Sequence, residues 1–373
     1  MSRILFVESW TELGGGQRLM LDLVEHLSGR GHICAVAFPG AGPVRELLQK
    51  RDVETFEYAL PALPAGSKTL LDRARFLAGA RGSAASLWEI GRGFGADLLF
   101  CMGGRPALTA ALAARRLNVP VVCSVQLIYR GSERRLLGWC FGRPEMASVT
   151  FCSTAAAAPF GHLDGKASLV PNWVSPVFLE APLRGRADAE SVVVGVLGRI
   201  SRTKGQRLFL EALLPLLEED PRLRLAIGGA SDFEDPSEER LLGRLIAQSG
   251  HADRVLFGGA VDALAFLDSL DVLVVPSLWE EPFGLVAVEG MARALPVVAT
   301  RSGALPEIVD QGTTGFIVGR DPSELRAAVA RLVGDPELRR AMGAAGRRRV
   351  EDRFGPSRQL PVVATLVERA LPA

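Results

Sequence analysis

Short apolar runs alternate with helical patterns along nearly the whole chain, and this alternation restricts the possible folds more than any other feature. The strand-like runs of the first half are Arg3–Glu8, Ile33–Phe38, Asp97–Cys101, Val119–Val125 and Ser148–Cys152. Those of the second half are Ser191–Leu197, Arg222–Ile227, Arg254–Phe257, Asp271–Val275, Pro296–Thr300 and Gly315–Val318. Because helical stretches separate the runs, the pattern predicts βαβ units and an α/β fold with two parallel sheets.

A chain of 373 residues, of which 48% are apolar, can bury large cores and is too long for one ordinary domain. The polar stretch 180–190 has weak periodicity and follows a proline-punctuated strand end, which is typical of an interdomain linker. We therefore expect one domain at 1–180 and a second at 181–353. We also expect a C-terminal helix within 354–373 that packs back on the first domain.

The overall charge gives no reason to expect a nucleic-acid partner, because 43 basic residues nearly balance 42 acidic ones. The five cysteines lie in separate, mostly apolar runs and are expected to be buried thiols in a reducing compartment. Their spacing matches no zinc site. The N-terminus lacks the pattern of a signal peptide, and no apolar stretch is long enough to cross a membrane, which predicts a cytoplasmic protein.

Three glycines, Gly14, Gly15 and Gly16, follow the first strand-like run, and a helical pattern begins directly after them. Their spacing differs from the G-x-G-x-x-G of a dinucleotide site, which argues against a nicotinamide cofactor. Glycines nevertheless let a ligand approach the backbone closely at a helix N-terminus. The alternative is a flexible turn that binds nothing.

The stretch Pro276–Glu289 joins a strand to a helix and carries two spaced carboxylates. Pro276 ends the β-branched run before it, and Pro282 suits the first turn of the helix that follows. Such a junction directs free N–H groups and the positive end of the helix dipole at a ligand. Glu281 in the loop and Glu289 in the helix would then bind neutral hydroxyl groups, such as those of a sugar and a ribose. Alternatively, Glu281 pairs with the dipole and Glu289 is a solvated helix residue.

A second charged loop, Gly198–Gly205, follows the first strand of the second half and opens a helix. Its Arg199 and Lys204 suit a diphosphate, because arginine offers a planar pair of donors and lysine a compact charge. Solvated surface cations are the alternative. Both this loop and the Glu281 loop lie at carboxyl ends of strands, where open α/β sheets bind ligands, so we favour a common binding site.

Arginines are interleaved with leucine, tryptophan and phenylalanine in the stretch 130–143. This composition is compatible with contact to a membrane surface or to an anionic acceptor. A solvated helix with one buried face explains it as well, and we prefer that interpretation.

The order and spacing of these motifs resemble the retaining glycosyltransferases of family 4, which have the GT-B fold. The resemblance covers nearly the whole chain, and the matching pieces are Gly14–Arg18, Val170–Val174, Gly198–Gly205, Phe257–Gly258 and Pro276–Glu289. The last of these matches the family's E-x7-E signature. The resemblance implies two Rossmann-like parallel-sheet domains that face each other across a cleft.

The resemblance also implies a role for each matching residue. Arg199 and Lys204 would hold the nucleotide diphosphate. Glu281 would bind hydroxyls of the donor sugar, and Glu289 would hold the ribose. The other donor-site residues implied are Phe257, the backbone N–H groups of Phe283, Gly284 and Leu285, and, from the first domain, Gly15 and Gly16. The acceptor would bind in the first domain.

One position departs from the family pattern. Gln126 follows the run Val121–Val125, where family members commonly carry a histidine near the donor sugar. A glutamine can hydrogen-bond a sugar hydroxyl but cannot carry a proton. We therefore count Gln126 among the catalytic residues, together with Glu281, Arg199 and Lys204. If position 126 acts through orientation or through its backbone carbonyl, activity is kept, and if an imidazole is needed, the enzyme is weak. We favour the active enzyme.

These features predict an enzyme that transfers a sugar, with retention of configuration, from a nucleotide-diphosphate sugar to an acceptor hydroxyl on a glycan, lipid carrier or small molecule. No metal or other cofactor is expected, because Arg199 and Lys204 would offset the diphosphate charge. Two alternatives stay open. Gln126 is compatible with a noncatalytic partner subunit that binds nucleotide sugars, and the same two-sheet architecture serves sugar-nucleotide epimerases and phosphorylases. The spacing of Glu281 and Glu289 argues against the epimerase.

Overall fold

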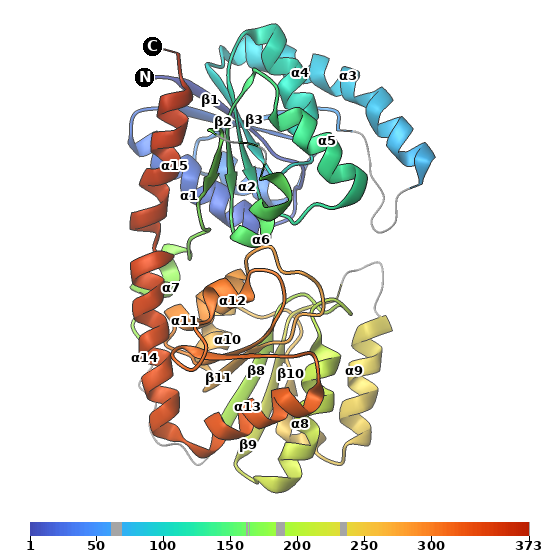
Figure 1. The fold of residues 1–373 in the computed structure, drawn as a ribbon, viewed down its shortest axis with the longest axis vertical. Helices are drawn as coiled ribbons and strands as arrows, with labels where there is room; N and C mark the ends of the chain where they lie inside the picture. The colour runs from blue at the N-terminus through green and yellow to red at the C-terminus, as the bar shows by residue number, and fades with distance from the viewer. Residues whose placement is uncertain (61–68, 162, 164, 184–190, 232–236, 373) are drawn as a thin grey trace. The chain divides into compact units, whose positions relative to one another are not determined.

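The computed structural model describes residues 1–60, 69–161, 163, 165–183, 191–231 and 237–372. The chain forms two compact units, the first made of Met1–Asn172 and Gln359–Ala373 and the second of Trp173–Arg358. Each unit contains a parallel β-sheet flanked by helices (Figure 1). The predicted α/β class with two parallel-sheet domains is confirmed.

The first sheet has seven strands in the order β3-β2-β1-β4-β5-β6-β7. They are β1 (Arg3–Val7), β2 (Ile33–Phe38), β3 (Glu54–Glu57), β4 (Leu98–Met102), β5 (Val121–Val125), β6 (Met146–Phe151) and β7 (Ala167–Leu169). The helices that accompany them are α1 (Gly15–Gly29), α2 (Pro43–Gln49), α3 (Leu70–Phe94), α4 (Ala107–Leu117), α5 (Gly131–Phe141), α6 (Thr154–Ala157), η1 (Ala158–Phe160) and most of α15 (Pro356–Ala370). Because β1 borders both β2 and β4, the winding of the sheet reverses between β1 and β4.

The second sheet has the order β10-β9-β8-β11-β12-β13, so its winding reverses between β8 and β11. Its strands are β8 (Val192–Leu197), β9 (Leu223–Gly228), β10 (Val255–Phe257), β11 (Val272–Val275), β12 (Val297–Thr300) and β13 (Gly315–Val318). Its helices are α7 (Pro176–Glu180), α8 (Gln206–Glu219), α9 (Ser237–Gln248), η2 (Ala252–Arg254), α10 (Ala263–Asp268), α11 (Leu285–Ala292), α12 (Leu305–Ile308), α13 (Pro322–Gly334) and α14 (Pro336–Arg353).

The apolar strand sequences follow from burial on both faces of each sheet. Val194, Val274 and Val298, from three strands of the second sheet, are fully buried. They share one core with Phe209 of α8 and Val329 of α13. Because helices cover a parallel sheet on both sides, its central strands read as continuous apolar runs rather than as alternating ones.

Strand β3 was not predicted from the sequence, and of β7 only its end was predicted, as the proline-punctuated strand end that begins at Leu169. Strand β3 reads Glu54-Thr-Phe-Glu57, with a charged residue at each end, and β7 has three residues. Both lie at the edges of the first sheet. An edge strand is paired on one side only and needs no long apolar run, so the pattern that revealed the central strands is absent there.

The structure begins the second unit at Trp173, whereas the sequence analysis placed the boundary at residue 180. The Val174 N–H donates to the Phe354 carbonyl over 2.9 Å, so the chain already packs within the second unit at this point. The proline-punctuated stretch is therefore the start of that unit. Most of the predicted linker, 184–190, lies outside the described residues.

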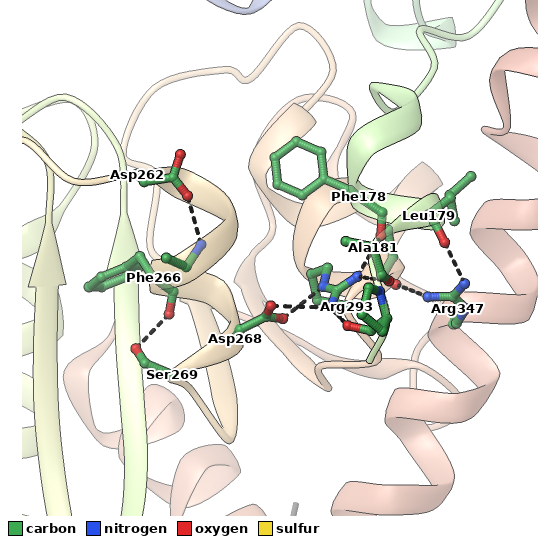
Figure 2. Close-up of polar contacts among 12 residues, drawn as sticks. Phe178, Leu179, Ala181, Asp262, Phe266, Asp268, Ser269, Arg293 and Arg347 are labelled. Atoms are coloured by element: carbon green, nitrogen blue, oxygen red, sulfur yellow. Dashed lines mark hydrogen bonds and ion pairs between the residues drawn. The ribbon is translucent and has the colours of Figure 1, made fainter. Parts of the chain in front are cut away.

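A buried arginine holds this segment in place (Figure 2). The side chain of Arg293 is fully buried, and its Nε and Nη2 atoms donate to the two carboxylate oxygens of Asp268 over 2.7 and 3.1 Å. Its Nη1 atom donates to the carbonyls of Phe178 (3.0 Å) and Ala181 (2.8 Å). Its Nη2 atom also donates to the carbonyl of Pro182 over 2.6 Å. One guanidinium thus fixes α7 and the residues after it to the second unit.

The C-terminal helix α15 returns to the first unit from Gln359 onward. Near its end, Glu368 accepts hydrogen bonds from Nε and Nη2 of Arg30 over 2.8 and 3.0 Å. Arg30 directly follows α1. This bidentate pair therefore attaches the last described turns of the chain to the first helix.

Candidate functional site

Two loops meet at the carboxyl ends of β8 and β11. Gly205 has a left-handed φ of 76°, and a Cβ atom there would lie 1.9 Å from the Pro276 carbonyl oxygen. The N–H of Leu278 donates to the Thr203 carbonyl over 2.8 Å. Glycine therefore permits the contact between the loops 198–205 and 276–284 at the reversal point of the sheet, where α/β folds bind ligands.

The contact between the loops brings Lys204 and Glu281 together, which the sequence analysis had placed in one site. The Lys204 Nζ atom donates to Glu281 Oε1 over 2.5 Å. The Ser277 hydroxyl donates to the same oxygen over 2.7 Å, and the Lys204 Nζ atom lies 5.4 Å from the centre of the Trp279 ring. Ser277 and Trp279 were not predicted. Both residues follow strand β11 directly, within the stretch Pro276–Glu289, and this position was the sequence feature that could have pointed to them.

The loop after β12 packs against the backbone of the Glu281 loop. The N–H of Ala304 donates to the Glu281 carbonyl over 2.8 Å. Gly303 has φ 53°, and a Cβ atom there would lie 2.1 Å from that carbonyl oxygen. The Gly303 N–H donates to Oε2 of the neighbouring Glu280 over 3.0 Å. The backbone of the Glu281 loop is thus fixed by hydrogen bonds to a second loop.

The helix after this loop begins as the sequence predicts. Gly284 precedes α11 with φ 105°, and Leu285 is the first residue of the helix. The side chain of Phe283 is buried and packs edge-on against Phe354, with ring centres 5.7 Å apart, so only its backbone is available to a ligand. The first N–H groups of a helix have no partner within it. Glu289 lies more than one turn further along α11 and is half-buried.

Arg199 and Phe257 lie at the same sheet edge in different surroundings. Arg199 is exposed after β8, and the buried Gln206 donates through Nε2 to the carbonyls of Arg199 (3.0 Å) and Gly198 (3.3 Å), which fixes the loop backbone. Phe257 ends β10 and packs partly against the core. Strand β9 separates β10 from β8, so Phe257 stands apart from the pair of Lys204 and Glu281.

In the first unit, the predicted residues also follow strands of one sheet. Gly15 and Gly16 are the first two residues of α1. Gln126 follows β5, and its Nε2 atom donates to the Ser124 hydroxyl over 2.8 Å. Its Oε1 atom accepts from Nδ2 of the buried Asn172 over 2.7 Å. Both ends of the Gln126 amide are therefore engaged.

A buried carboxylate near α1 was missed by the sequence analysis. Glu8 follows β1 and is 2% exposed. Burial raises the pKa of Glu8 to about 7, although hydrogen bonds from Ser9, Trp10 and Gln17 act in the opposite direction. The sequence run Arg3–Glu8 ends on this residue, but a terminal charge on a strand is usually solvated, so the pattern carried no sign of burial.

Neither a metal cluster nor a membrane span is found in the described part of the chain. Within it, no group of three or more histidine, cysteine or acidic side chains is placed to hold a metal ion. No described helix is both long and apolar enough to cross a bilayer. The free and buried cysteines are Cys34, Cys101, Cys123, Cys140 and Cys152.

The stretch 130–143 forms α5 and has one buried face, as in the interpretation we preferred. Leu137, Cys140 and Phe141 are buried. Trp139 is 55% exposed, and the guanidinium carbon of Arg143 lies 4.9 Å from the centre of its ring. The outer face of α5 therefore presents an aromatic side chain beside a cation.

Both halves of the chain match models of glycosyltransferase domains. Residues 14–173 match a model described as a glycosyl transferase 4-like domain, and residues 191–335 match one described as glycosyl transferases group 1. The lipopolysaccharide core biosynthesis mannosyltransferase LpsB of Rhizobium meliloti is 32% identical over 256 residues, covering 64% of this chain and 70% of that protein.

Other curated relatives match over shorter regions. A D-inositol 3-phosphate glycosyltransferase of Corynebacterium jeikeium is 40% identical over 159 residues, covering 40% of this chain. Spore coat protein SA of Bacillus subtilis is 29% identical over 169 residues, covering 44% of this chain. These two matches span 37% and 45% of the relatives' own lengths.

Solved structures share the fold over nearly the whole chain. HepE of Anabaena, crystallised with UDP and glucose, has a TM-score of 0.83 at 20% identity and covers 99% of this chain and 100% of its own. A glycosyltransferase from Rickettsia africae has a TM-score of 0.81 at 18% identity and covers 99% of this chain and 98% of its own. With the LpsB match and both domain models, these findings show that the chain belongs to the family 4 glycosyltransferases with the GT-B fold.

Proposed function

We propose that this chain transfers a sugar from a nucleoside diphosphate sugar to an acceptor hydroxyl with retention of configuration. The observation that carries the proposal is the cluster of Lys204, Ser277 and Glu281 at the reversal point between β8 and β11. A cation, a hydroxyl and a carboxylate there suit a ligand that carries both phosphate groups and sugar hydroxyls. Membership of the family supports the same class of reaction.

The cations act on the leaving group in this proposal. As the bond between the anomeric carbon and the phosphate oxygen breaks, negative charge grows on the diphosphate. Lys204, Arg199 and the N–H groups at the start of α11 stabilise that charge, so no metal ion is required. Glu281 accepts hydrogen bonds from hydroxyls of the donor sugar, and Glu289 accepts them from the ribose. The assignments of Phe257, Gly15 and Gly16 to the donor site are part of the same proposal.

The acceptor oxygen bonds to the anomeric carbon on the face from which the diphosphate leaves. A phosphate oxygen takes up the acceptor's proton, so no side chain has to act as a general base. This agrees with Gln126, whose amide is held by Ser124 and Asn172 and cannot carry a proton. Gln126 then orients the donor sugar.

The donor nucleotide is chosen from a structural neighbour, and the acceptor class is the one predicted from the sequence. HepE of Anabaena was crystallised with UDP-glucose, so we propose the uridine series as the first donors to test. The acceptor is a hydroxyl compound of the glycan, lipid carrier or small-molecule class. For the whole protein we propose a cytoplasmic location, with peripheral membrane contact through the exposed Trp139 and the arginines of 130–143.

Thermal unfolding with added nucleotides tests the donor site. A ligand that binds the folded state raises the melting temperature by mass action. We expect one of UDP, GDP or ADP to stabilise the wild type at millimolar concentration, and Lys204→Ala or Arg199→Ala to remove most of that shift. Arg202→Ala is the matched control, because Arg202 is an exposed cation of the same loop. If the Arg202 variant loses the shift and the other two keep it, the assignment of the diphosphate site is wrong.

Turnover separates an enzyme from a partner subunit that only binds nucleotide sugars. We expect the wild type to consume the corresponding nucleotide sugar when a hydroxyl acceptor mixture is supplied. Requirement for inorganic phosphate would identify a phosphorylase, and stabilisation by the nucleotide without any consumption of its sugar would favour the noncatalytic subunit.

A further inference from the structure

Glu8, the buried carboxylate at the end of β1, takes no part in the donor site proposed above. Strand β1 borders β4 where the winding of the first sheet reverses, and ligands of α/β sheets bind at such a point. The loop that starts after Glu8 leads to the glycines at the start of α1. Trp10 in this loop is 58% exposed, and the guanidinium carbon of Arg105 lies 6.0 Å from the centre of its ring. The loop thus presents an aromatic face beside a cation.

Hydrogen bonds tie both ends of this loop to Glu8. The Oε1 atom of Glu8 accepts from the N–H groups of Ser9 (2.6 Å) and Trp10 (3.1 Å). Its Oε2 atom accepts from Nε2 of Gln17 over 3.3 Å. The Oε1 atom of Gln17 in turn accepts from the N–H of Gly14 over 3.2 Å. One carboxylate therefore connects the beginning of the loop with its end.

We propose that Glu8 is a positioning residue, which acts through Gln17 to hold the loop 9–14 and the start of α1 in the arrangement that sugar transfer needs. The effect on transfer rests on the proposed function, whereas the effect on the loop does not.

The direction of these hydrogen bonds requires an acceptor at both oxygens of residue 8. In Glu8→Gln, one terminal atom becomes an NH2 group. Turned toward Ser9 and Trp10, that group faces two donors, and turned toward Gln17 it faces another NH2 group. A flip of the Gln17 amide only moves the conflict to the N–H of Gly14. Every orientation therefore breaks at least one hydrogen bond of the loop, and with the Gln17 amide flipped the exposed N–H of Gly14 loses its acceptor.

Exchanging the two side chains removes the conflict. In the double variant Glu8→Gln/Gln17→Glu, the carboxylate at position 17 accepts from both the amide at position 8 and the N–H of Gly14. A carboxylate in the first turn of α1 also interacts favourably with the helix dipole. The single variant Gln17→Glu instead places two carboxylates against each other. Rescue in the double variant therefore shows that the direction of the hydrogen bonds between residues 8, 17 and 14 holds the loop, which a merely structural role would not predict.

Protonation of Glu8 has the same consequence as Glu8→Gln, because the added proton turns one acceptor oxygen into a donor. It occurs near neutral pH because burial raises the pKa of Glu8 to about 7.

The other titratable groups around Glu8 keep their charge at this pH. Tyr58 donates its hydroxyl to the Glu8 carbonyl over 2.8 Å, and burial raises the pKa of Tyr58 far above neutrality. Arg105 and Cys101 face Tyr58. Burial lowers the pKa of Arg105, but a guanidinium stays charged at neutral pH. The contact with Cys123 and burial raise the pKa of Cys101. Of these groups, only Glu8 changes charge near pH 7.

Amide hydrogen exchange of the full chain tests, without any substrate, whether Glu8 holds the loop 9–14. After correction for intrinsic exchange rates, residues 9–17 of the wild type should lose protection by about fivefold or more as the pH falls from about 8 to about 6, since one hydrogen bond is worth about 1 kcal/mol. The sign differs from that of global unfolding, because loop opening breaks the hydrogen bonds that lower the pKa of Glu8, whereas global unfolding removes the burial that raises it. Glu8→Gln should be poorly protected at both pH values, and the double variant should regain protection. Glu12→Gln, a change of an exposed carboxylate in the same loop, is the matched control and should follow the wild type.

Transfer activity gives the second readout. The rate should fall in the wild type as the pH drops through about 7, stay low without that step in Glu8→Gln, and recover in the double variant. Wild-type protection in Glu8→Gln, or no recovery in a double variant that melts like the wild type, overturns the proposal. If the wild type turns over no nucleotide sugar, the proposed function fails, while the exchange experiment still decides whether Glu8 holds the loop.

Discussion

The Nζ atom of Lys204 lies 2.5 Å from Oε1 of Glu281, and the two residues come from loops that follow neighbouring strands. The pair is asymmetric, because the side chain of Glu281 is 7% exposed and that of Lys204 is 28% exposed. Removing the lysine leaves a buried carboxylate without its cation. Removing the carboxylate's charge leaves a lysine that can reach water.

This asymmetry predicts different losses of stability. We expect Lys204→Met to lower the free energy of unfolding by about 2–4 kcal/mol and Glu281→Gln to lower it by less than about 1 kcal/mol. Urea denaturation of the protein without ligands measures both values. Arg202→Met, which removes an exposed cation from the same loop, should change stability by less than about 0.5 kcal/mol. A larger loss in Glu281→Gln than in Lys204→Met would show that the carboxylate is not held by the lysine.

Gly205 allows the two loops of the site to touch. We expect Gly205→Ala to lower the free energy of unfolding by about 2 kcal/mol or more, because φ is 76° and the added Cβ would lie 1.9 Å from the Pro276 carbonyl oxygen. Nucleotide binding should weaken in the same variant. Gly243→Ala in α9 is the control, because nothing lies within 4 Å of its added Cβ, and it should be neutral or stabilising by about 0.5–1 kcal/mol. Equal effects of the two substitutions would contradict the packing argument.

Arg293 fixes α7 to the second unit through five hydrogen bonds that a lysine cannot reproduce. Arg293→Lys should therefore lower the free energy of unfolding by about 3 kcal/mol, although it keeps the charge. Chemical denaturation provides the measurement, and Arg348→Lys, at an exposed position of α14, provides the control. A loss below about 1 kcal/mol would mean that the hydrogen bonds of Arg293 add little to the stability of the second unit.

Glu8 gives stability a pH dependence with a defined sign. Its pKa is raised in the folded state from 4.5 to about 7, so the folded state binds the proton more tightly than the unfolded state. Wild-type stability should therefore fall as the pH rises from about 4.5 to about 7 and then level off. The free energy of unfolding of Glu8→Gln, taken relative to that of the wild type, should therefore rise by about 3 kcal/mol between about pH 4.5 and about pH 7, at about 1.36 kcal/mol per pKa unit. Glu12→Gln should show no such trend.

The central strands and the donor-side loops were predictable because each left a local pattern. The runs that became β2 and β13 were predicted with their observed bounds, since buried parallel strands are continuously apolar. Pro276 and Pro282 marked a strand end and a helix start. The strands of both halves ended at motif-bearing loops, which was enough to expect Lys204 and Glu281 in one place.

The features that were missed depend on contacts between distant residues. The chain of hydrogen bonds from Glu8 through Gln17 to Gly14 involves no repeating pattern, and nothing local distinguishes a buried glutamate from a solvated one at the end of a strand. The early start of the second unit depends on Arg293, more than a hundred residues from Phe178. A boundary set by such a contact cannot be located from composition alone.

The anomeric configuration of the sugar first released from an α-linked donor tests the central claim most directly. Incubated with UDP-glucose and no acceptor, the wild type should slowly transfer the sugar to water, and proton NMR should detect the α anomer before mutarotation. Lys204→Ala should reduce this hydrolysis by about 10²-fold or more, as expected when a group that stabilises the leaving charge is removed. Initial release of the β anomer, or hydrolysis that is undiminished in Lys204→Ala, would contradict retention at this site.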